Sequence, residues 1–334
     1  MKMKMKPIQT GRGQRFALTT TLLVTVLLLA ACGQVAPAES GAATGTTPGE
    51  KLRVIATTNI VADVVRQVGG DKIELTALLP PGSDPHSYQA TPDDLRRLND
   101  AQVIFVNGLH LEEAMAPVLE NLDTPTPVVS VNDGVVTREL NGEEHDAATA
   151  ATSDAHGHEG VDPHTWMNPA NVVVWSENVA RVLSELDPAN AASYAAAAAA
   201  YAAELKQLDD ELRTQFATIP VAQRKLVTDH DNLGYLADAY GFTVLGSVIP
   251  SLSTMAAPSA QEMAALQDQI QTEGARVILV GNTVNPAAAQ QLARDTGAQV
   301  VPIYAGSLSD EAGPAATYIA MMRHNAAAIL AAFG

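Results

Sequence analysis

Short runs of β-branched and aliphatic residues alternate with helical periods in two separate blocks, and this alternation limits the fold more than any other feature of the sequence. The first block holds strand candidates at 52–57, 73–79, 102–106 and 127–131, and the second holds them at 225–228, 242–248, 276–280 and 299–303. Helix candidates lie among them at 59–69, 92–99, 111–121, 233–240, 259–273, 286–296 and 313–332. Apolar strands that alternate with helices are typical of parallel sheets covered on both faces. The sequence therefore predicts an α/β protein with two parallel-sheet lobes.

Several predicted helices begin at clear capping signals. Thr91 precedes Pro92 and stands three residues before Asp94, which is a capping-box pattern with proline at the first helical position. Asn168 and Asn285 each precede a proline in the same way.

The segment between the two blocks predicts two long amphipathic helices. The first carries apolar residues three or four positions apart, at Val172, Trp175, Val179, Val182 and Leu186. The second opens at Pro188, and its apolar stripe comprises Tyr194, Ala198, Tyr201, Leu205, Leu208, Leu212 and Phe216. A helix over 188–219 would be about 45 Å long, more than a compact lobe needs, so we interpret it as a rigid connector between lobes. The alternative is a long helix packed on one domain.

The predicted domains follow from this interpretation. An N-terminal lobe occupies 51–187, the linking helix occupies 188–219, and a C-terminal lobe occupies 220–334.

The N-terminus is typical of a bacterial targeting segment. A basic stretch from Lys2 to Arg15 precedes an apolar run at 16–30, which is too short for a typical membrane-spanning helix. The run ends at Cys32 in a segment, LAAC, that resembles a lipoprotein lipobox. We therefore expect 1–31 to be a signal peptide, Cys32 to be lipidated and 32–50 to be a flexible tether to the membrane. The alternative is an ordinary cleaved signal with a chance cysteine.

Charge and cysteine content exclude several classes of protein. The 334 residues carry a net charge of −17, which argues against nucleic acid as a partner because phosphates need a basic face. There is one cysteine, so disulfide frameworks, zinc ribbons and iron–sulfur sites are excluded. An acidic chain is compatible with a cationic ligand, although excess acid also serves solubility.

Three histidines stand where predicted strands end or helices begin. His86 and His164 each follow an Asp-Pro pair, and His230 follows Asp229 at the end of a strand. Ligands of open parallel sheets bind beyond the carboxyl ends of the strands, and neutral imidazole is the commonest metal-ligating side chain. Spacing alone leaves two interpretations open, a shared metal site or three hydrogen-bonded loop residues.

Four segments of the chain carry a family resemblance. They are PPGSDPHSYQATPDDLRRLNDAQVIFVNGLHLE, VDPHTWMNPAN, TDHDNLGYLADAYGF and YAGSLSDEAGPAATYIAMMRHNAAAIL. Together they resemble the metal-binding solute-binding proteins of bacterial ABC importers, the zinc/manganese family that includes adhesin-like lipoproteins, over about residues 50–334. The resemblance implies two α/β lobes joined by a long rigid helix, with the metal between them and His86, His164 and His230 as ligands.

One departure from the family affects the expected ligand set. The family often supplies a fourth ligand from an aspartate in its tail motif, and Gly306 stands at that place here. The fourth position is then water, a nearby acid such as Asp310 or Glu311, or empty. Manganese-type members tend to carry Glu where this chain has His230, whereas zinc-type members carry His. Both features favour Zn²⁺ as the transported ligand, with Mn²⁺ or Fe²⁺ as the alternative.

The insertion at 142–160 is rich in histidine and acid. It contains His145, His156 and His158, and zinc-type family members often carry such a loop in this region. Its two interpretations are a weak accessory metal site and a polar surface loop of no consequence. His110 and His324 are expected to be surface or helix residues rather than ligands.

A binding protein fits these observations better than an enzyme or a structural adhesin. A zinc hydrolase is the competing class, but the H-E-x-x-H motif is absent, and a single cysteine excludes the deaminase signature. An adhesin would not need three converging histidines. We therefore expect a monomeric, extracytoplasmic, membrane-anchored zinc-binding protein that delivers Zn²⁺ to the permease of an ABC importer.

Overall fold

Two four-stranded sheets with the same strand order form the framework of the protein. The computed structural model describes residues 51–139 and 160–334, which all belong to one compact unit. The first sheet has the order β2-β1-β3-β4 and is parallel throughout, with β1 at Leu52–Ala56, β2 at Ile73–Ala77, β3 at Val103–Val106 and β4 at Val128–Ser130. The second has the order β6-β5-β7-β8, with β5 at Lys225–His230, β6 at Thr243–Ile249, β7 at Val277–Gly281 and β8 at Gln299–Ile303.

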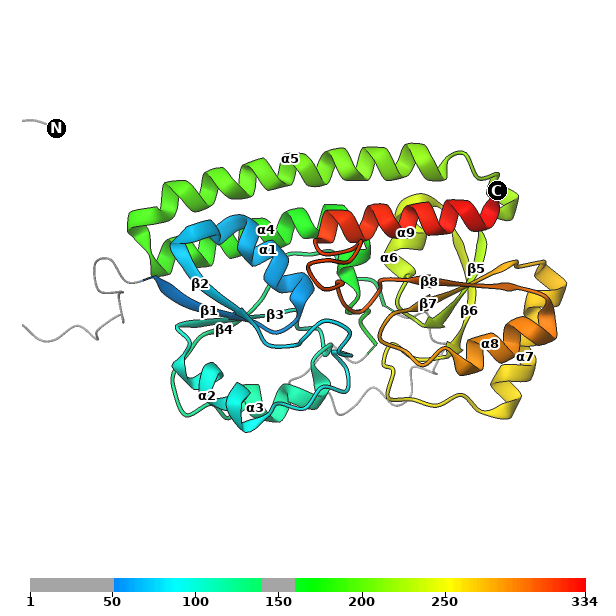
Figure 1. Ribbon diagram of the computed structural model, residues 1–334, viewed down its shortest axis with the longest axis horizontal. Coiled ribbons are helices and arrows are strands. Elements are labelled where there is room, and N and C mark those ends of the chain that lie inside the picture. Colours follow the sequence, from blue (N-terminus) through cyan, green and yellow to red (C-terminus); the bar gives the residue numbers. More distant parts are fainter. Residues whose placement is uncertain (1–50, 140–159) are drawn as a thin grey trace, which may run out of the picture. The chain divides into compact units, whose positions relative to one another are not determined.

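Helices cover these sheets and complete each lobe (Figure 1). The N-terminal lobe contains α1 (Asn59–Gly69), α2 (Pro92–Asp100), α3 (Ala116–Glu120) and α4 (Pro169–Leu186). The C-terminal lobe contains α6 (Gly234–Tyr240), α7 (Ala260–Glu273), α8 (Ala287–Thr296) and α9 (Tyr318–Phe333). Short 3₁₀ segments lie at Gly70–Lys72, Glu113–Met115, Thr165–Met167, Pro188–Asn190 and Val221–Gln223.

Two of the three helix caps form where the sequence predicts them. Thr91 and Asp94 make both hydrogen bonds of a capping box at α2, and the Asn168 side chain accepts from the backbone N–H of Ala170 at the start of α4. Asn285 also accepts from the N–H of Ala287, but α8 begins one residue later than predicted, with Pro286 rather than Asn285 at the N-cap position.

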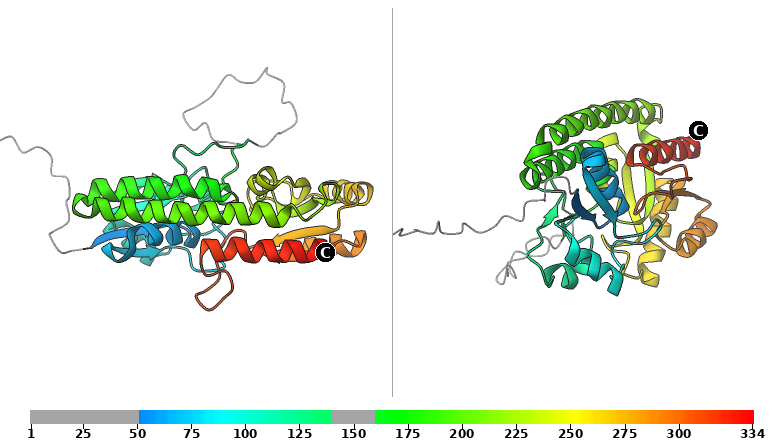
Figure 2. Two further views of the ribbon diagram at one scale, coloured as in Figure 1. Left: turned by 90° about the horizontal axis from the view of Figure 1, so that it is seen from above. Right: turned by 60° about the vertical axis from the view of Figure 1, so that its left-hand side comes forward.

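The long helix α5 (Ala191–Phe216) contacts both lobes. It packs against α4 and α1 of the N-terminal lobe and against α9 and α6 of the C-terminal lobe, and Figure 2 shows it running beside α4 and on past the N-terminal lobe. All seven residues of its predicted stripe are buried. One hydrophobic core extends from Leu52 of β1 through α5 to Ile329 of α9. The predicted two-lobe fold with a long linking helix is therefore confirmed, and the helix is packed along its length.

Three predicted helices differ from the structure. The segment at 111–121 forms a 3₁₀ turn followed by the five-residue α3, because Pro117 has no N–H and its ring cannot fit inside a continuous helix. The last helix begins at Tyr318 rather than at 313, since Thr317 caps it by accepting from the N–H of Ala320. The linking helix is also shorter than 188–219, with a 3₁₀ turn at Pro188–Asn190 and the regular helix ending at Phe216.

Several hydrogen bonds that do not involve the histidines join the two lobes. Asp63 of α1 accepts from the N–H of Tyr318 at the start of α9, and Asn59 pairs with Ser307 and Leu308. The indole of Trp166 donates to the carbonyl of Ala305. Because these bonds lie between buried or half-buried groups, they hold the lobes in one arrangement. In the parts of the chain that the structure covers, no helix is long and apolar enough to cross a membrane.

Candidate metal centre

Three imidazoles from distant parts of the chain meet between the lobes. His86 lies in the loop between β2 and α2, His164 immediately precedes a 3₁₀ turn before α4, and His230 is the last residue of β5. The Nε2 atom of His164 lies 3.2 Å from Nε2 of His86 and 3.3 Å from Nε2 of His230. All three side chains are at least 96% buried. The structure thus brings together the three histidines that the sequence singled out.

The His164 ring is oriented by the residue two positions before it. Asp162 Oδ1 lies 2.9 Å from His164 Nδ1 and also accepts from the backbone N–H of His164. Asp162 is fully buried, and its second oxygen is 3.3 Å from the guanidinium of Arg138. The Asp-Pro-His turn therefore presents Nε2 to the centre and keeps Nδ1 on the carboxylate.

His230 is held in the same way at the carboxyl end of the second sheet. Asp229 Oδ1 lies 2.7 Å from His230 Nδ1, and Asp229 Oδ2 accepts from the N–H of Gly281, 2.5 Å away, at the end of β7. The order of the strands reverses between β5 and β7, which is where open α/β sheets bind ligands. The strand order thus explains why His230 faces the gap between the lobes.

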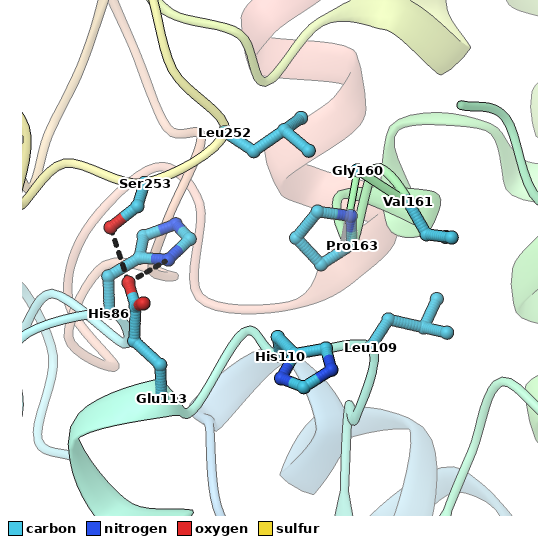
Figure 3. Close-up of a pocket in the computed structure, with 9 residues that line it drawn as sticks. All are labelled: His86, Leu109, His110, Glu113, Gly160, Val161, Pro163, Leu252 and Ser253. Carbon is cyan, nitrogen blue, oxygen red and sulfur yellow. Dashed lines mark hydrogen bonds and ion pairs between the residues drawn. The ribbon is translucent and has the colours of Figure 1, made fainter. Parts of the chain in front are cut away.

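His86 differs from the other two histidines because no described residue makes a hydrogen bond to its Nδ1 atom. Asp84 is the equivalent of Asp162, but its Oδ1 accepts only from the backbone N–H of His86, at 3.2 Å. The nearest acid is Glu113, whose Oε1 lies 3.7 Å from His86 Nδ1 (Figure 3). A cavity of about 220 Å³ opens on this side of His86 and is lined by His86, Leu109, His110, Glu113, Gly160, Val161, Pro163, Leu252 and Ser253.

Burial keeps the rings of His86 and His164 neutral. Removal from water, with the nearby His164 and His230 rings, lowers the pKa of His86 to about 2. Burial also lowers the pKa of His164, although Asp162 opposes the effect. A neutral ring whose Nδ1 donates to a carboxylate carries its lone pair on Nε2. For His164 and His230, the hydrogen-bond network therefore assigns the lone pair to the nitrogen that faces the centre.

Lone pairs that converge in this way can bind a metal cation. Tetrahedral zinc with Zn–N bonds of about 2.05 Å would separate neighbouring nitrogens by about 3.3 Å, which agrees with the observed separations of 3.2 and 3.3 Å. Among the described residues, no cysteine, aspartate or glutamate joins the three histidines in a group whose ligand atoms all lie within 4.8 Å. Within the described residues, the arrangement thus offers three nitrogen ligands.

Thr283 stands beside the glycine at which the expected tail aspartate is absent. A Cβ atom added to Gly306 would lie 2.6 Å from Thr283 Oγ1 and 3.1 Å from its methyl carbon. The space next to Gly306 is therefore taken by a hydroxyl-bearing side chain. Asp310 and Glu311, considered from the sequence as a fourth ligand, do not belong to the histidine group.

The remaining histidines that the structure describes lie outside this group. His110 is exposed on the loop before the 3₁₀ turn at Glu113–Met115, and His324 is half-buried on α9 with its ring 5.3 Å from that of Tyr304. His145, His156 and His158 of the acidic insertion, and Cys32 of the lipobox, lie outside the described residues.

Sequence reasoning missed the part played by the acids around the histidines. Asp162 and Asp84 were recognised only as parts of rigid turns, although an aspartate two residues before a histidine was an available signal. Asp229 was noted as the residue before His230, but not as the carboxylate that orients that ring. No sequence signal pointed to Glu113, because it lies near His86 in the folded structure but not along the sequence.

Comparison with known proteins places the chain in a family. The family model described as zinc-uptake complex component A, periplasmic, matches residues 54–332. The iron ABC transporter substrate-binding lipoprotein MtsA of Streptococcus pyogenes serotype M1 is 29% identical over 323 residues, covering 94% of this chain and 96% of MtsA. The manganese-binding lipoprotein MntA of Halalkalibacterium halodurans is 31% identical over 306 residues, covering 91% and 94%.

A solved structure agrees with the sequence relatives. The periplasmic zinc-binding protein TroA of Treponema pallidum superimposes with a TM-score of 0.76 at 28% identity, covering 85% of this chain and 100% of TroA. These matches confirm the family resemblance that the histidine-containing segments carry. The chain belongs to the periplasmic zinc-uptake component A family and is a substrate-binding protein of a metal ABC transporter.

Proposed function

We propose that this protein captures Zn²⁺ outside the cytoplasm and delivers it to the permease of an ABC importer. The observation that carries the proposal is the convergence of three buried Nε2 atoms from both lobes. Carboxylates on the Nδ1 atoms of His164 and His230 orient these rings as ligands and raise their basicity. His86, His164 and His230 are the proposed metal ligands.

The donor atoms favour zinc over manganese. Mn²⁺ prefers oxygen-rich surroundings, whereas Zn²⁺ accepts four-coordinate sites built from imidazole nitrogen. The described residues supply three nitrogens and no carboxylate ligand to this group. The alternative is delivery of Mn²⁺ or Fe²⁺ by the same kind of importer. This alternative needs a direct test because MntA is named as a manganese-binding lipoprotein and MtsA as an iron transporter lipoprotein.

We propose binding rather than catalysis. A hydrolytic zinc site needs a base beside the open position. Asp229, the acid next to His230 in the sequence, is already engaged by His230 and by the backbone of Gly281. Metal capture is therefore the activity that these residues support best.

Lipidation of Cys32 is proposed as the membrane attachment. The signal segment at 1–31 would be removed, and residues 32–50 would link the lipid to the folded monomer. Cys32→Ser should release the protein from membranes without changing its metal affinity, because Cys32 lies outside the part of the chain that carries the histidines. Mass spectrometry that finds an unmodified Cys32 would contradict the proposal.

The insertion at 142–160 is proposed as a weaker, additional zinc site. Its histidines are His145, His156 and His158. Deletion of the insertion should remove only weakly held zinc and leave one tight ion per chain. Loss of the tight ion on deletion would contradict this assignment.

The central experiment measures metal content after stripping and competitive reloading. Purified protein is loaded from an equimolar mixture of Zn²⁺, Mn²⁺ and Fe²⁺, and each metal is then quantified. We expect one tight zinc per chain, and its loss in His86→Ala, His164→Ala and His230→Ala, with His324→Ala as the matched control. Retention of manganese or iron in preference to zinc would make the alternative correct. Hydrolytic turnover by the zinc-loaded protein would contradict the assignment as a binding protein.

A further inference from the structure

Two identical tripeptides, Asp-Pro-His at 84–86 and at 162–164, hold their histidines differently. Asp162 accepts from both the backbone N–H and the Nδ1 atom of His164. Asp84 accepts from the backbone N–H of His86, but its other oxygen accepts from Ser87 and from Thr254, 2.7 and 2.6 Å away. His86 Nδ1 is therefore left buried and without a hydrogen bond.

Glu113 is the acid that is placed to supply the missing hydrogen bond to His86 Nδ1. Its Oε1 atom lies 3.7 Å from His86 Nδ1, so a shift of about 0.8 Å would bring it to hydrogen-bond distance. The neighbouring Glu112 is buried, where it accepts from Thr57 and from the N–H groups of Asn107 and Gly108. Glu112 thus anchors the loop, while the Glu113 side chain extends toward His86 (Figure 3).

The backbone before Glu113 carries strain that fixes its position. Leu109 and His110 have φ values of 54° and 63°, in the left-handed region that residues with a Cβ rarely adopt. Such conformations persist where the surroundings enforce them, and they occur often at ligand sites. The anchored Glu112 and the strained turn together hold Glu113 at the edge of the cavity beside His86.

The same oxygen of Glu113 is contacted from the other lobe. The Ser253 hydroxyl, in the segment after β6, donates to Glu113 Oε1, and its neighbour Thr254 donates to Asp84. One short segment of the C-terminal lobe therefore contacts both acids around His86. We propose, on the basis of the proposed metal-binding function, that Glu113 is the positioning residue for His86 and that Ser253 holds it there when the lobes are closed on the metal.

The chemical consequence follows from the geometry. A metal on His86 Nε2 withdraws electron density from the ring and makes Nδ1–H a stronger donor, which attracts the Glu113 carboxylate. Glu113 then does for His86 what Asp162 and Asp229 do for the other two rings. Ser253 bonds to the same Glu113 oxygen that lies near His86 Nδ1. Loosening of residues 251–254 would therefore weaken the positioning of His86 before that of His164 and His230.

The test compares zinc affinities by chelator competition. Glu113→Ala should weaken zinc binding by about 10- to 100-fold, as other carboxylate partners of metal-bound histidines do. Glu113→Gln, which retains an acceptor oxygen, should recover part of this loss and covers the case in which the alanine variant folds poorly. The matched control is Glu120→Ala, an exposed glutamate at the end of α3 that is expected to bind zinc as the wild type does.

A double-mutant cycle tests the role of Ser253. Ser253→Ala should weaken zinc binding by about fivefold, and it should have no further effect when Glu113 is already alanine. Additive losses would mean that Ser253 acts independently, which would overturn its part of the proposal.

A spectroscopic readout separates positioning from a merely structural role. In zinc-loaded protein, Glu113→Ala should move the ¹⁵N signal of His86 Nδ1 and leave those of His164 and His230 in place. Full zinc affinity with an unmoved His86 signal would refute the inference even if the three histidines bind zinc. Failure of the wild type to bind zinc would instead refute the proposed function.

Discussion

At the residue scale, the Thr283 side chain fills the space next to Gly306, where the family often has an aspartate ligand. By the family resemblance, an aspartate at 306 would provide the oxygen ligand that favours manganese. From the sequence alone, the single substitution Gly306→Asp would therefore suffice to add this ligand. In the structure, its Cβ would lie 2.6 Å from Thr283 Oγ1, closer than such atoms approach one another. The threonine must therefore move or be removed before a carboxylate can enter.

This leads to a prediction about a pair of substitutions. Gly306→Asp alone should destabilise the protein by about 1–3 kcal/mol through overpacking, and it should gain little manganese affinity. Thr283→Ala combined with Gly306→Asp should relieve the clash and raise manganese affinity relative to zinc. Thermal unfolding and competitive metal loading of both variants check the prediction. Equal manganese gain in the single and double variants would show that Thr283 is no obstacle.

The depressed pKa of His86 predicts how the metal-free protein responds to acid. Its pKa is lowered to about 2 in the folded protein, whereas the unfolded chain has the ordinary value near 6.5. Below pH 6.5 the unfolded state therefore binds more protons, and the free energy of unfolding falls as the pH falls.

The size of this effect can be measured. His86 should contribute up to about 1.4 kcal/mol of lost stability per pH unit between about pH 6 and pH 3. In denaturant titrations, His86→Ala should show a shallower slope of stability against pH than the wild type, and His324→Ala should keep the wild-type slope. An unchanged slope in His86→Ala would contradict the prediction.

At the scale of elements, two buried tyrosines on α5 differ in one respect. The Tyr194 hydroxyl donates to Asp187 Oδ2 at 2.7 Å, whereas the buried Tyr201 hydroxyl has no hydrogen-bond partner. A buried polar group without a partner costs stability, while a satisfied one contributes. The two positions therefore form a matched pair for testing hydrogen-bond energetics in the linking helix.

We expect opposite effects from the same chemical change. Tyr201→Phe should raise the free energy of unfolding by about 1 kcal/mol, and Tyr194→Phe should lower it by about 1.5 kcal/mol because the bonded acceptor is a carboxylate. Chemical denaturation of the two variants beside the wild type checks both values. Destabilisation by Tyr201→Phe would mean that its hydroxyl is satisfied.

The elements could be predicted closely where one local signal decided the outcome. The stripe of α5 and the caps at Thr91 and Asn168 appear as expected, because periodicity and capping depend on neighbouring residues alone. The start of α9 was wrong by five residues, since Ala315 and Ala316 extend the apolar pattern and only the Thr317 hydrogen bond marks the boundary. Pro117 should have warned that no helix could continue through 111–121.

At the scale of the whole molecule, the bonds between the lobes limit their motion. Hydrogen bonds that do not involve the histidines join the lobes, from Tyr318 N–H to Asp63, from Trp166 to Ala305, and from Asn59 to Ser307 and Leu308. Helix α5 contacts both lobes. Metal capture by a wide hinge movement would have to break these bonds together. Limited closure is therefore the expected response.

Small-angle scattering and hydrogen exchange test this expectation. A compact domain spanning residues 51–334 should have a radius of gyration of about 18–19 Å. Zinc binding should change this value by less than about 1 Å. Slowed exchange should be concentrated at 84–88, 228–232 and 250–255. A large compaction, or protection spread evenly over both lobes, would favour a hinge.

The candidate site could be predicted only in part from the sequence, because its geometry depends on the packing of the lobes. The three histidines stand beside strand ends and rigid turns, so the local sequence already shows that they could reach a ligand. Their mutual distances, and the role of Glu113, depend on how the lobes pack against each other. Spacing along the chain contains no information on that packing, and the family resemblance supplied it.

The core that both lobes share has a consequence for the newly made chain. The buried cluster runs from Leu52 to Ile329, and Tyr318, Met321 and Met322 of the last helix belong to it. Because synthesis starts at the N-terminus, the growing chain cannot complete this core until α9 has been made. We therefore expect the core to remain incomplete until α9 has been made, and any product that stops before Tyr318 to be degraded by proteases instead of accumulating as a half-protein that holds metal.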